Sequence, residues 1–160
     1  MLLLRWKDEY GTDEDMKVHW GSYQNNPTCG ALSLVSAGGT YPGEPYGTVT
    51  KNLVDEGYVM PKWCAFIDAN NMPEAPAILQ KAGLAEPTGG LARSGFCEYP
   101  LFMFHKDVLA KYVPKEDLKA YEDAYDDFVL KDLEASGREL PSTPEPDNSE
   151  DMNRDESFDF

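Results

Sequence analysis

Cysteine, long apolar runs and basic residues are all scarce in this sequence of 160 residues. Its cysteines, Cys29, Cys64 and Cys97, form an odd and sparse set, unlike the dense even sets of small secreted scaffolds, so we expect a reducing compartment. The apolar run at residues 2–4 is far shorter than the ~7 residues of a signal-peptide core or the ~20 of a membrane span. These absences predict a soluble, cytoplasmic protein.

Basic residues number 14 against 29 acidic ones, which gives a formal net charge of −15 at pH 7. A chain this acidic is repelled by nucleic-acid phosphates and by anionic membrane surfaces. We therefore expect neither direct binding to duplex DNA nor binding to a membrane.

The acidity is concentrated towards the end of the chain. Residues 1–114 hold 13 acidic and 9 basic residues, whereas residues 115–160 hold 16 and 5. From residue 136 onward, acids and prolines leave too little apolar surface to offset the entropy of ordering. The sequence thus predicts an α+β domain over 1–113, an acidic amphipathic helix over 114–135 and a disordered acidic tail over 136–160.

Several short segments of the first part have the alternation or the β-forming residues of strands. They predict an antiparallel sheet of about five strands with a meander topology, over residues 18–22, 31–36, 46–50, 64–67 and 99–104. Pro100 favours an edge position or a bulge in the last strand. The glycine-rich stretch before it, 88–95, is interpreted as a loop.

Residues 71–82 have the features of a short helix. Asn71 suits the N-cap, Pro73 the first turn and Gly83 the C-terminal end. Apolar residues between them recur at helical spacing, so we expect this helix to pack across one face of the sheet.

The strongest helical periodicity lies in residues 115–135. Its apolar stripe consists of Leu118, Tyr121, Tyr125, Phe128 and, less regularly, Leu133. Acidic residues cover much of the remaining surface: Glu116, Asp117, Glu122, Asp123, Asp126 and Asp127. Because lysines offset part of this charge, two interpretations stay open, a solvated face and a binding surface.

Three segments carry a resemblance to a known family: residues 43–53 (GEPYGTVTKNL), 65–71 (AFIDANN) and 94–102 (SGFCEYPLF). Together they resemble a family of small uncharacterised domains encoded on plasmids, conjugative elements and phages of intestinal bacteria. The resemblance spans roughly residues 16–110. It implies a mobile-element context and supplies no catalytic residue.

The residues of these segments also have structural explanations. Three glycines suit backbone positions that need a positive φ or a close approach: Gly43, Gly47 and Gly95. Four aromatic residues suit packing in a sheet: Tyr46, Phe66, Phe96 and Tyr99.

Few residues of this chain are candidates for catalysis or metal binding. Cys97 and His105 form the best nucleophile and base pair, but they lie eight positions apart in the chain. The cysteines and histidines lack the spacings of zinc sites, and the Asp68 cluster lacks the glycine and the distant glutamate of a calcium loop. We therefore expect no enzyme, no catalytic residue, no metal and no cofactor.

With no enzymatic site expected, the charge of the chain favours a binding function. Closely spaced carboxylates can occupy a basic groove that serves nucleic acid, because lysines and arginines respond to any negative charge. We expect a mobile-element accessory protein that binds a basic host protein, such as a defence nuclease inhibited by a nucleic-acid mimic of the antirestriction or anti-CRISPR type. The acids of residues 116–127 and of the tail would make the contacts.

The alternative is a single-stranded-DNA-binding or replication-associated protein. The chain ends in an acidic segment with an aromatic last residue, which resembles the tails with which single-stranded-DNA-binding proteins recruit partners. The matching residues are Asp155, Glu156, Asp159 and Phe160. Bases would then stack on aromatic residues of the first part, such as Trp20, Tyr23, Tyr41 and Tyr46.

Overall fold

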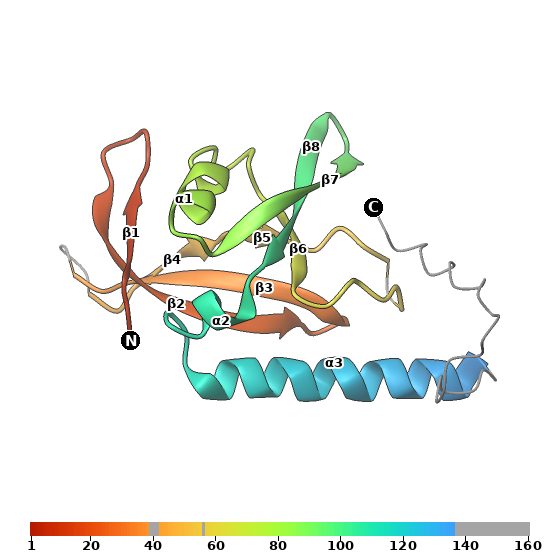
Figure 1. Ribbon diagram of the computed structural model, residues 1–160. Helices are drawn as coiled ribbons and strands as arrows, with labels where there is room; N and C mark the ends of the chain where they lie inside the picture. The colour runs from red at the N-terminus through yellow and green to blue at the C-terminus, as the bar shows by residue number, and fades with distance from the viewer. Residues whose placement is uncertain (39–41, 56, 137–160) are drawn as a thin grey trace.

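The computed structural model describes residues 1–38, 42–55 and 57–136 (Figure 1). Within these ranges the chain forms two antiparallel sheets of four strands each and three helices. No helix in the described part is long and apolar enough to cross a membrane. The α+β class that the sequence predicts is confirmed.

The first sheet is a meander of β1 (Leu4–Lys7), β2 (Asp13–Tyr23), β3 (Asn26–Ser36) and β4 (Pro45–Thr48). In β2 the side chains of Met16, Val18 and Trp20 are buried while their neighbours are more exposed, because alternate residues of a strand point to opposite faces. Trp20 pairs with Leu32 of β3.

The second sheet has the order β5-β6-β8-β7. It consists of β5 (Thr50–Lys51), β6 (Cys64–Ile67), β7 (Ala85–Ser94) and β8 (Cys97–Phe104). The chain crosses between the sheets at Val49, whose N–H donates to Leu32 O (2.8 Å) and whose carbonyl accepts from Asp68 N (2.8 Å). One residue therefore links the backbones of both sheets.

Three helices complete the described part of the fold. α1 (Ala75–Lys81) packs beside β7, α2 (Lys106–Leu109) is a single turn after β8, and α3 (Lys115–Ser136) runs along β2 and β3. Figure 1 shows α3 as one long helix lying under the first sheet. The sequence predicts this helix over nearly the same residues because its apolar stripe is regular.

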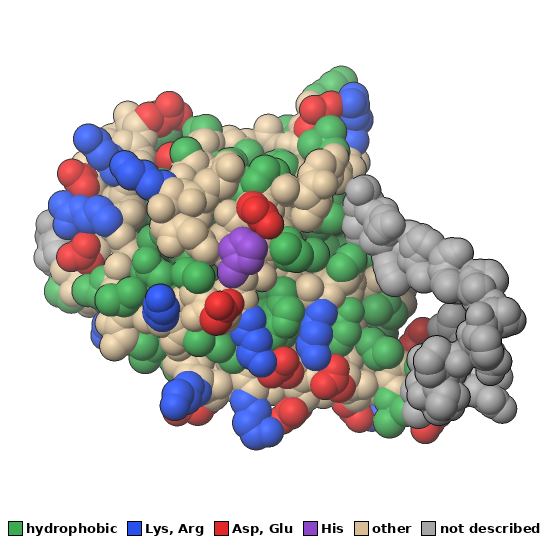
Figure 2. Space-filling view, viewed as in Figure 1, with side chains coloured by type: hydrophobic (Ala, Val, Ile, Leu, Met, Phe, Trp, Pro, Cys, Tyr) green, Lys and Arg blue, Asp and Glu red, His purple; other side chains and the backbone are tan. Residues whose placement is uncertain are grey.

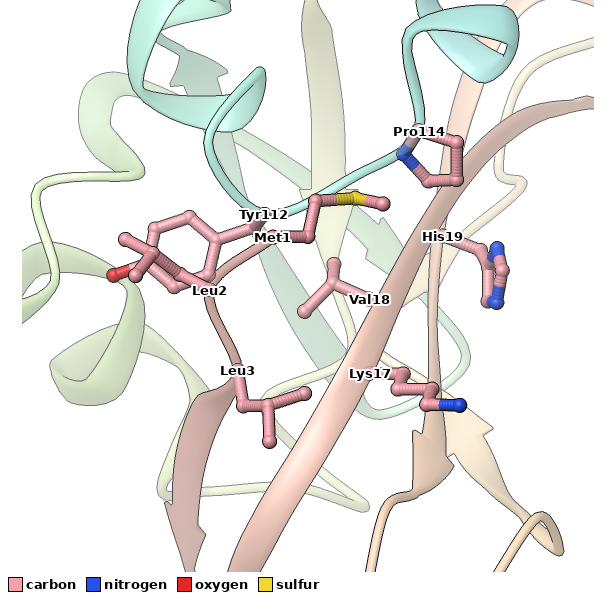
Figure 3. Close-up of a pocket in the computed structure, with 8 residues that line it drawn as sticks. All are labelled: Met1, Leu2, Leu3, Lys17, Val18, His19, Tyr112 and Pro114. Atoms are coloured by element: carbon pink, nitrogen blue, oxygen red, sulfur yellow. The ribbon is translucent and has the colours of Figure 1, made fainter.

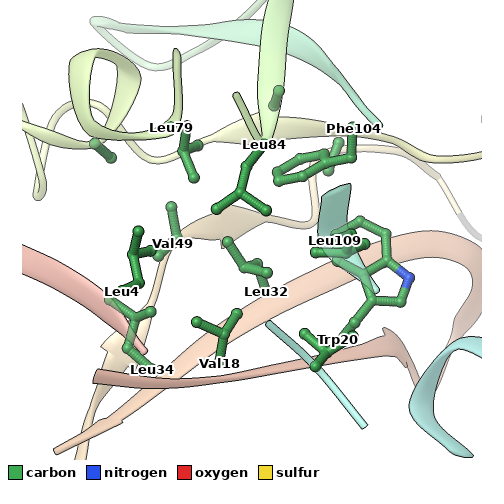
Figure 4. Packing of buried hydrophobic residues seen from close by; sticks show 14 of the residues in the cluster. Leu4, Val18, Trp20, Leu32, Leu34, Val49, Leu79, Leu84, Phe104 and Leu109 are labelled. Carbon is green, nitrogen blue, oxygen red and sulfur yellow. The ribbon is translucent and has the colours of Figure 1, made fainter. Parts of the chain in front are cut away.

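The main core lies between the two sheets (Figure 4). Side chains of the first sheet, such as Val18 and Leu32, face Leu84 and Phe104 of the other half, with Leu79 of α1 beside them. A smaller cluster of buried residues extends the core beside the first residues of β3. It consists of Cys29, Met60, Cys64, Phe66, Tyr99 and Leu101.

The expectation of one sheet of about five strands is wrong in its details. Two sheets are present, the strands β1 and β7 were not expected, and the segment 46–50 divides at Val49 between the sheets. β7 includes the stretch interpreted as a loop, because its register shifts between Pro87 and Leu91 and the extra residues, two of them glycines, are accommodated there.

β8 has a neighbour on each side, but its pairing with β6 ends at Leu101, so Pro100 pairs with β7 alone and has the edge position that its missing N–H favours. It pairs with Leu91, at the end of the shifted register in β7, so the irregularity expected at this proline lies in the partner strand. The missing N–H of proline is tolerated beside such an irregularity.

The start of α1 also differs from the expectation. Its N-cap is Glu74, whereas the Asn71 side chain donates to the carboxylate of Asp68 (2.9 Å) and closes a turn before the helix. Gly83 follows the C-cap residue Ala82 with a φ of 74°, which is the helix end that its position predicts.

The glycines and most aromatic residues of the family segments have the expected structural roles. Gly43 and Gly95 have positive φ angles, and a Cβ on Gly47 would lie 2.6 Å from Met72 Cε. Phe66 and Tyr99 are buried, but Phe96 is wholly exposed at the turn between β7 and β8. The packing expected for Phe96 is wrong because its position lies beyond the last pair of the hairpin, between Ser94 and Cys97.

Candidate functional site

Two tyrosine hydroxyls fasten α3 to the rest of the molecule. The hydroxyl of Tyr121 accepts a hydrogen bond from Trp63 N (3.1 Å) and donates to Thr28 O (3.3 Å). The hydroxyl of Tyr125, one turn later, donates to Met60 O. Because these bonds reach backbone groups of two other segments, they fix both the position and the rotation of the helix.

An aromatic cluster lies beneath the same turns of α3. The ring centre of Trp20 is 4.9 Å from that of Phe104 and 5.4 Å from that of Tyr121, and the centres of Trp63 and Tyr121 are 4.7 Å apart. Lys106 Nζ lies 5.7 Å from the centre of the Trp63 ring. Contacts of these lengths are typical of stabilising aromatic and cation–π pairs.

Two of the acidic residues of α3 form ion pairs with lysines outside the helix, Lys106 of α2 and Lys62 in the turn before β6. Glu122 pairs with Lys106 (3.0 Å) and lies 3.8 Å from Lys62, and Lys62 pairs with Asp126 (3.0 Å). Figure 2 shows acidic and basic side chains interspersed along the surface where α3 lies. Glu122 and Asp126 thus take part in holding the helix.

Asp117 points towards the first sheet. Its carboxylate accepts a hydrogen bond from Trp20 N (3.1 Å) and lies 3.4 Å from Nδ1 of His19. A carboxylate in the first turn is also favourably placed at the positive end of the helix dipole. Asp117 therefore joins the start of α3 to the edge of β2 that faces away from β3.

The other acids of the helix face outward. Glu116 is exposed and has no ion-pair partner in the part of the chain that the structure describes. Asp123 pairs with Lys119 (3.0 Å) and Asp127 with Lys131 (3.1 Å), and these four side chains are 60–78% exposed. The tail candidates Asp155, Glu156, Asp159 and Phe160 lie outside the described residues.

The candidate catalytic pair is not brought together. Cys97 begins β8 and His105 follows its last residue, so the two lie at opposite ends of an eight-residue strand, about 25 Å apart at the usual rise. His105 instead lies 3.8 Å from Glu86. Among the described residues, no group of three or more histidine, cysteine or acidic side chains has the arrangement of a metal site.

The aromatic residues proposed for base stacking are engaged inside the protein. Trp20 is buried, the Tyr23 hydroxyl is hydrogen-bonded to that of Thr50, and the Tyr46 hydroxyl donates to Asp8 (2.7 Å). Tyr41 lies outside the described residues.

A pocket that was not predicted from the sequence lies beside β2, just before the start of β1. It has a volume of about 340 Å³ and is lined by Met1, Leu2, Leu3, Lys17, Val18, His19, Tyr112 and Pro114 (Figure 3). A second hollow of about 470 Å³ adjoins it and shares Leu3 and Tyr112. The run of leucines in residues 2–4 was its one signal in the sequence.

Comparison with known proteins finds one family. Residues 7–125 match the model of a domain of unknown function, DUF4313. This match extends further at both ends than the resemblance seen in the sequence and includes the first half of α3. Neither a curated protein nor a solved structure is significantly similar to the chain.

Proposed function

The chain belongs to the DUF4313 family, and we propose that it acts by binding a basic protein through the outward acids of α3. The partner class is a nucleic-acid-binding enzyme, for example a defence nuclease encountered by a mobile element. The observation that carries the proposal is that α3 is rigidly fastened on its inner side while Glu116, Asp123 and Asp127 remain on its outer side.

Rigidity matters because a decoy must present its charges in a fixed array. Asp123 and Asp127 are one helical turn apart, about 5.4 Å along the axis, and they follow the same face of a helix that cannot rotate. Ordered carboxylates on a fixed element lose less conformational entropy on binding than carboxylates on a mobile segment.

Intrahelical lysines do not prevent this use of the acids. Exposed ion pairs such as Lys119 with Asp123 stabilise a protein by only about 0–1 kcal/mol, so an arginine of the partner can replace the lysine at small cost. By contrast, Glu122 and Asp126 join separate elements, and we assign them and Asp117 to holding α3 rather than to contacting the partner.

The test compares two full-length variants that remove equal charge. One carries Glu116→Gln, Asp123→Asn and Asp127→Asn. The matched control carries Glu9→Gln, Glu44→Gln and Asp55→Asn, at exposed positions away from α3. Proteins captured from a bacterial lysate by wild type would be identified, purified and titrated with all three forms at several salt concentrations.

The proposal expects the α3 variant to bind at least about tenfold more weakly, with a flatter salt dependence, and the control to bind like wild type. Equal binding by all three forms would overturn it. Binding of labelled single-stranded DNA by wild type, with no nuclease captured, would instead favour the alternative single-strand function.

A further inference from the structure

The pocket of Figure 3 and the hollow beside it form one trough between the start of the chain and the segment that joins α2 to α3. Leu3 and Tyr112 line both spaces, of about 340 Å³ and about 470 Å³, so the two meet at these side chains. Leu2 N donates a hydrogen bond to Lys111 O (2.8 Å), which holds the first residues in place as one wall. Spaces of this size are typical of sites for small molecules.

The wall of the first hollow is apolar and exposed. Leu2 and Leu3 are 51% and 44% exposed, and the neighbouring Met1 is more exposed still. Exposed apolar side chains that lie together, rather than singly, indicate a binding surface. An apolar chain laid along this wall would remove these side chains from water, which is favourable in proportion to the area covered.

The charged side chains of the trough are mostly basic. Four lysine or arginine residues line the two hollows, Arg5, Lys7, Lys17 and Lys81, against one carboxylate, Asp13. In the whole chain the ratio is reversed, with 29 acidic residues and 14 basic ones. Arg5 is paired with Asp13, whereas the three lysines have no ion-pair partner among the residues that the structure describes. The trough is therefore a site of unpaired positive charge on an acidic protein.

This charge is unevenly divided along the trough. Lys17 is the one lysine or arginine that lines the first hollow, while Lys7 and Lys81 border the second together with the Arg5 ion pair. Figure 2 shows basic side chains, with acidic ones between them, at the end of the molecule where β1 and α1 lie. The occupant that fits both hollows is elongated, with an apolar body and a negative charge at one end.

We propose that the trough binds a fatty acid, a single unbranched apolar chain with a carboxylate at one end. The chain lies in the first hollow along Leu2 and Leu3, and the carboxylate reaches Lys7 and Lys81 in the second. An unbranched chain is narrow and flexible, so it can pass Leu3 and Tyr112 where the hollows meet. This inference is separate from the proposed function and stands whether or not the outer acids of α3 bind a partner.

The first test compares two probes that share a ten-carbon chain and carry opposite charges, decanoate and decyltrimethylammonium. Each is titrated into the full-length protein and followed by the methyl NMR signals of Leu2 and Leu3. We expect decanoate to shift these signals and to bind at least about tenfold more tightly than the cation. Since the net charge of −15 favours the cation, a preference for the anion must come from the local charge of the trough. Equal affinities, or unchanged signals of Leu2 and Leu3, would overturn the proposal.

A pair of variants tests the cationic end. Lys7→Gln/Lys81→Gln should bind decanoate about fivefold more weakly than wild type, because two exposed charge interactions are lost. The matched control Lys51→Gln/Lys131→Gln removes two lysines that line neither hollow, and should bind like wild type. A loss of the same size in both proteins would mean that the net charge governs binding, and the assignment of the carboxylate to the second hollow would be wrong.

A second pair tests the apolar wall. Leu3→Ser removes a side chain that lines both hollows and should weaken decanoate binding by about fivefold. The control Leu130→Ser, at a 38% exposed position of α3, should bind like wild type. Both changes are made at exposed positions, and circular dichroism would verify that both proteins are folded. Vesicles of phosphatidylglycerol present acyl chains and negative charge in a membrane, and binding to these vesicles without binding of free decanoate would contradict a site for a single fatty acid.

Discussion

The hydroxyl of Tyr121 in α3 bridges the backbone of Trp63, from which it accepts a hydrogen bond, and the backbone of Thr28 in β3, to which it donates. Trp63 has a φ of 66°, in the left-handed region that side chains other than glycine rarely adopt. Its conformation is thus stabilised by a residue that lies 58 positions later in the chain.

Removing this hydroxyl should destabilise the protein. In Tyr121→Phe the Trp63 N–H and the Thr28 carbonyl lose a partner in a buried setting, and we expect the free energy of unfolding to fall by about 1–3 kcal/mol. Urea titration followed by circular dichroism measures this change. The control Tyr10→Phe alters a ring that is 84% exposed, and should shift the free energy by less than about 0.5 kcal/mol. Equal stability of the two variants would contradict the bridging role.

Gly30 should tolerate no side chain. A Cβ at this position would lie 2.2 Å from Cζ2 of Trp20, whose ring is packed against Phe104 and Tyr121 and has no room to move. Gly30→Ala is therefore expected to reduce the free energy of unfolding by about 1–3 kcal/mol through overpacking.

The matched control for this change is Gly21→Ala. Gly21 lies in β2 opposite Ala31, and a Cβ there would meet nothing within 4 Å. Thermal unfolding of both variants should show a clear loss for position 30 and little change for position 21. A loss of similar size at both positions would mean that the cost comes from the strand backbone and not from Trp20.

Asp8 should make stability depend on pH. The hydrogen bond donated by the Tyr46 hydroxyl, together with bonds from the N–H groups of Thr12 and Tyr10, lowers the pKa of Asp8 from 3.8 to about 2. Because the pKa is lower in the folded state, the ionised carboxylate stabilises the fold above about pH 4, and this contribution is lost as the pH falls towards 2.

Asp8→Asn should thus be less stable than wild type at pH 6, and the difference should shrink between pH 4 and pH 2. Urea titrations across this range measure it. The control Glu44→Gln, at an exposed position, should follow wild type throughout. A constant gap between Asp8→Asn and wild type down to pH 2 would show that the lost stability does not come from ionisation.

The three thiols should differ in reactivity. Burial raises the pKa of Cys29 and of Cys64 to about 11, so at pH 8 only about one thiol in a thousand is ionised at either site. Cys97 is partly exposed near the β7–β8 turn. Intact-mass analysis after iodoacetamide treatment should show one fast addition, mapped to Cys97, and two more only in denaturant; three equal rates would contradict this ranking.

Local sequence patterns were sufficient for elements whose side chains follow one regular period. β6 was predicted at its observed bounds, and α3 within one residue, because the Leu118, Tyr121 and Tyr125 stripe is continuous. The segment 46–50 was interpreted as one strand, since its residues all favour β structure. Its division at Val49 depends on Leu32 and Asp68, which are distant in the chain, and no local pattern carries that information.

The candidate site, like the fold, could be predicted only in part from the sequence. The acids of α3 could be read from the sequence, and so could the i,i+4 pairs of Lys119 and Lys131. The ion pair of Lys106 with Glu122 spans 16 residues and that of Lys62 with Asp126 spans 64, so the division of the acids into inner and outer sets required the fold. The pocket beside β2 likewise forms from residues at the start of the chain and around Pro114.

The two backbone hydrogen bonds of Val49 couple the stability of one sheet to that of the other. Val49 is fully buried, and its N–H and carbonyl are hydrogen-bonded to different sheets. Opening either sheet at this residue leaves a buried polar group of the other without a partner, which is costly. We therefore expect the two sheets to gain and lose their order together, so that the molecule unfolds as one cooperative unit without a populated form in which a single sheet is intact.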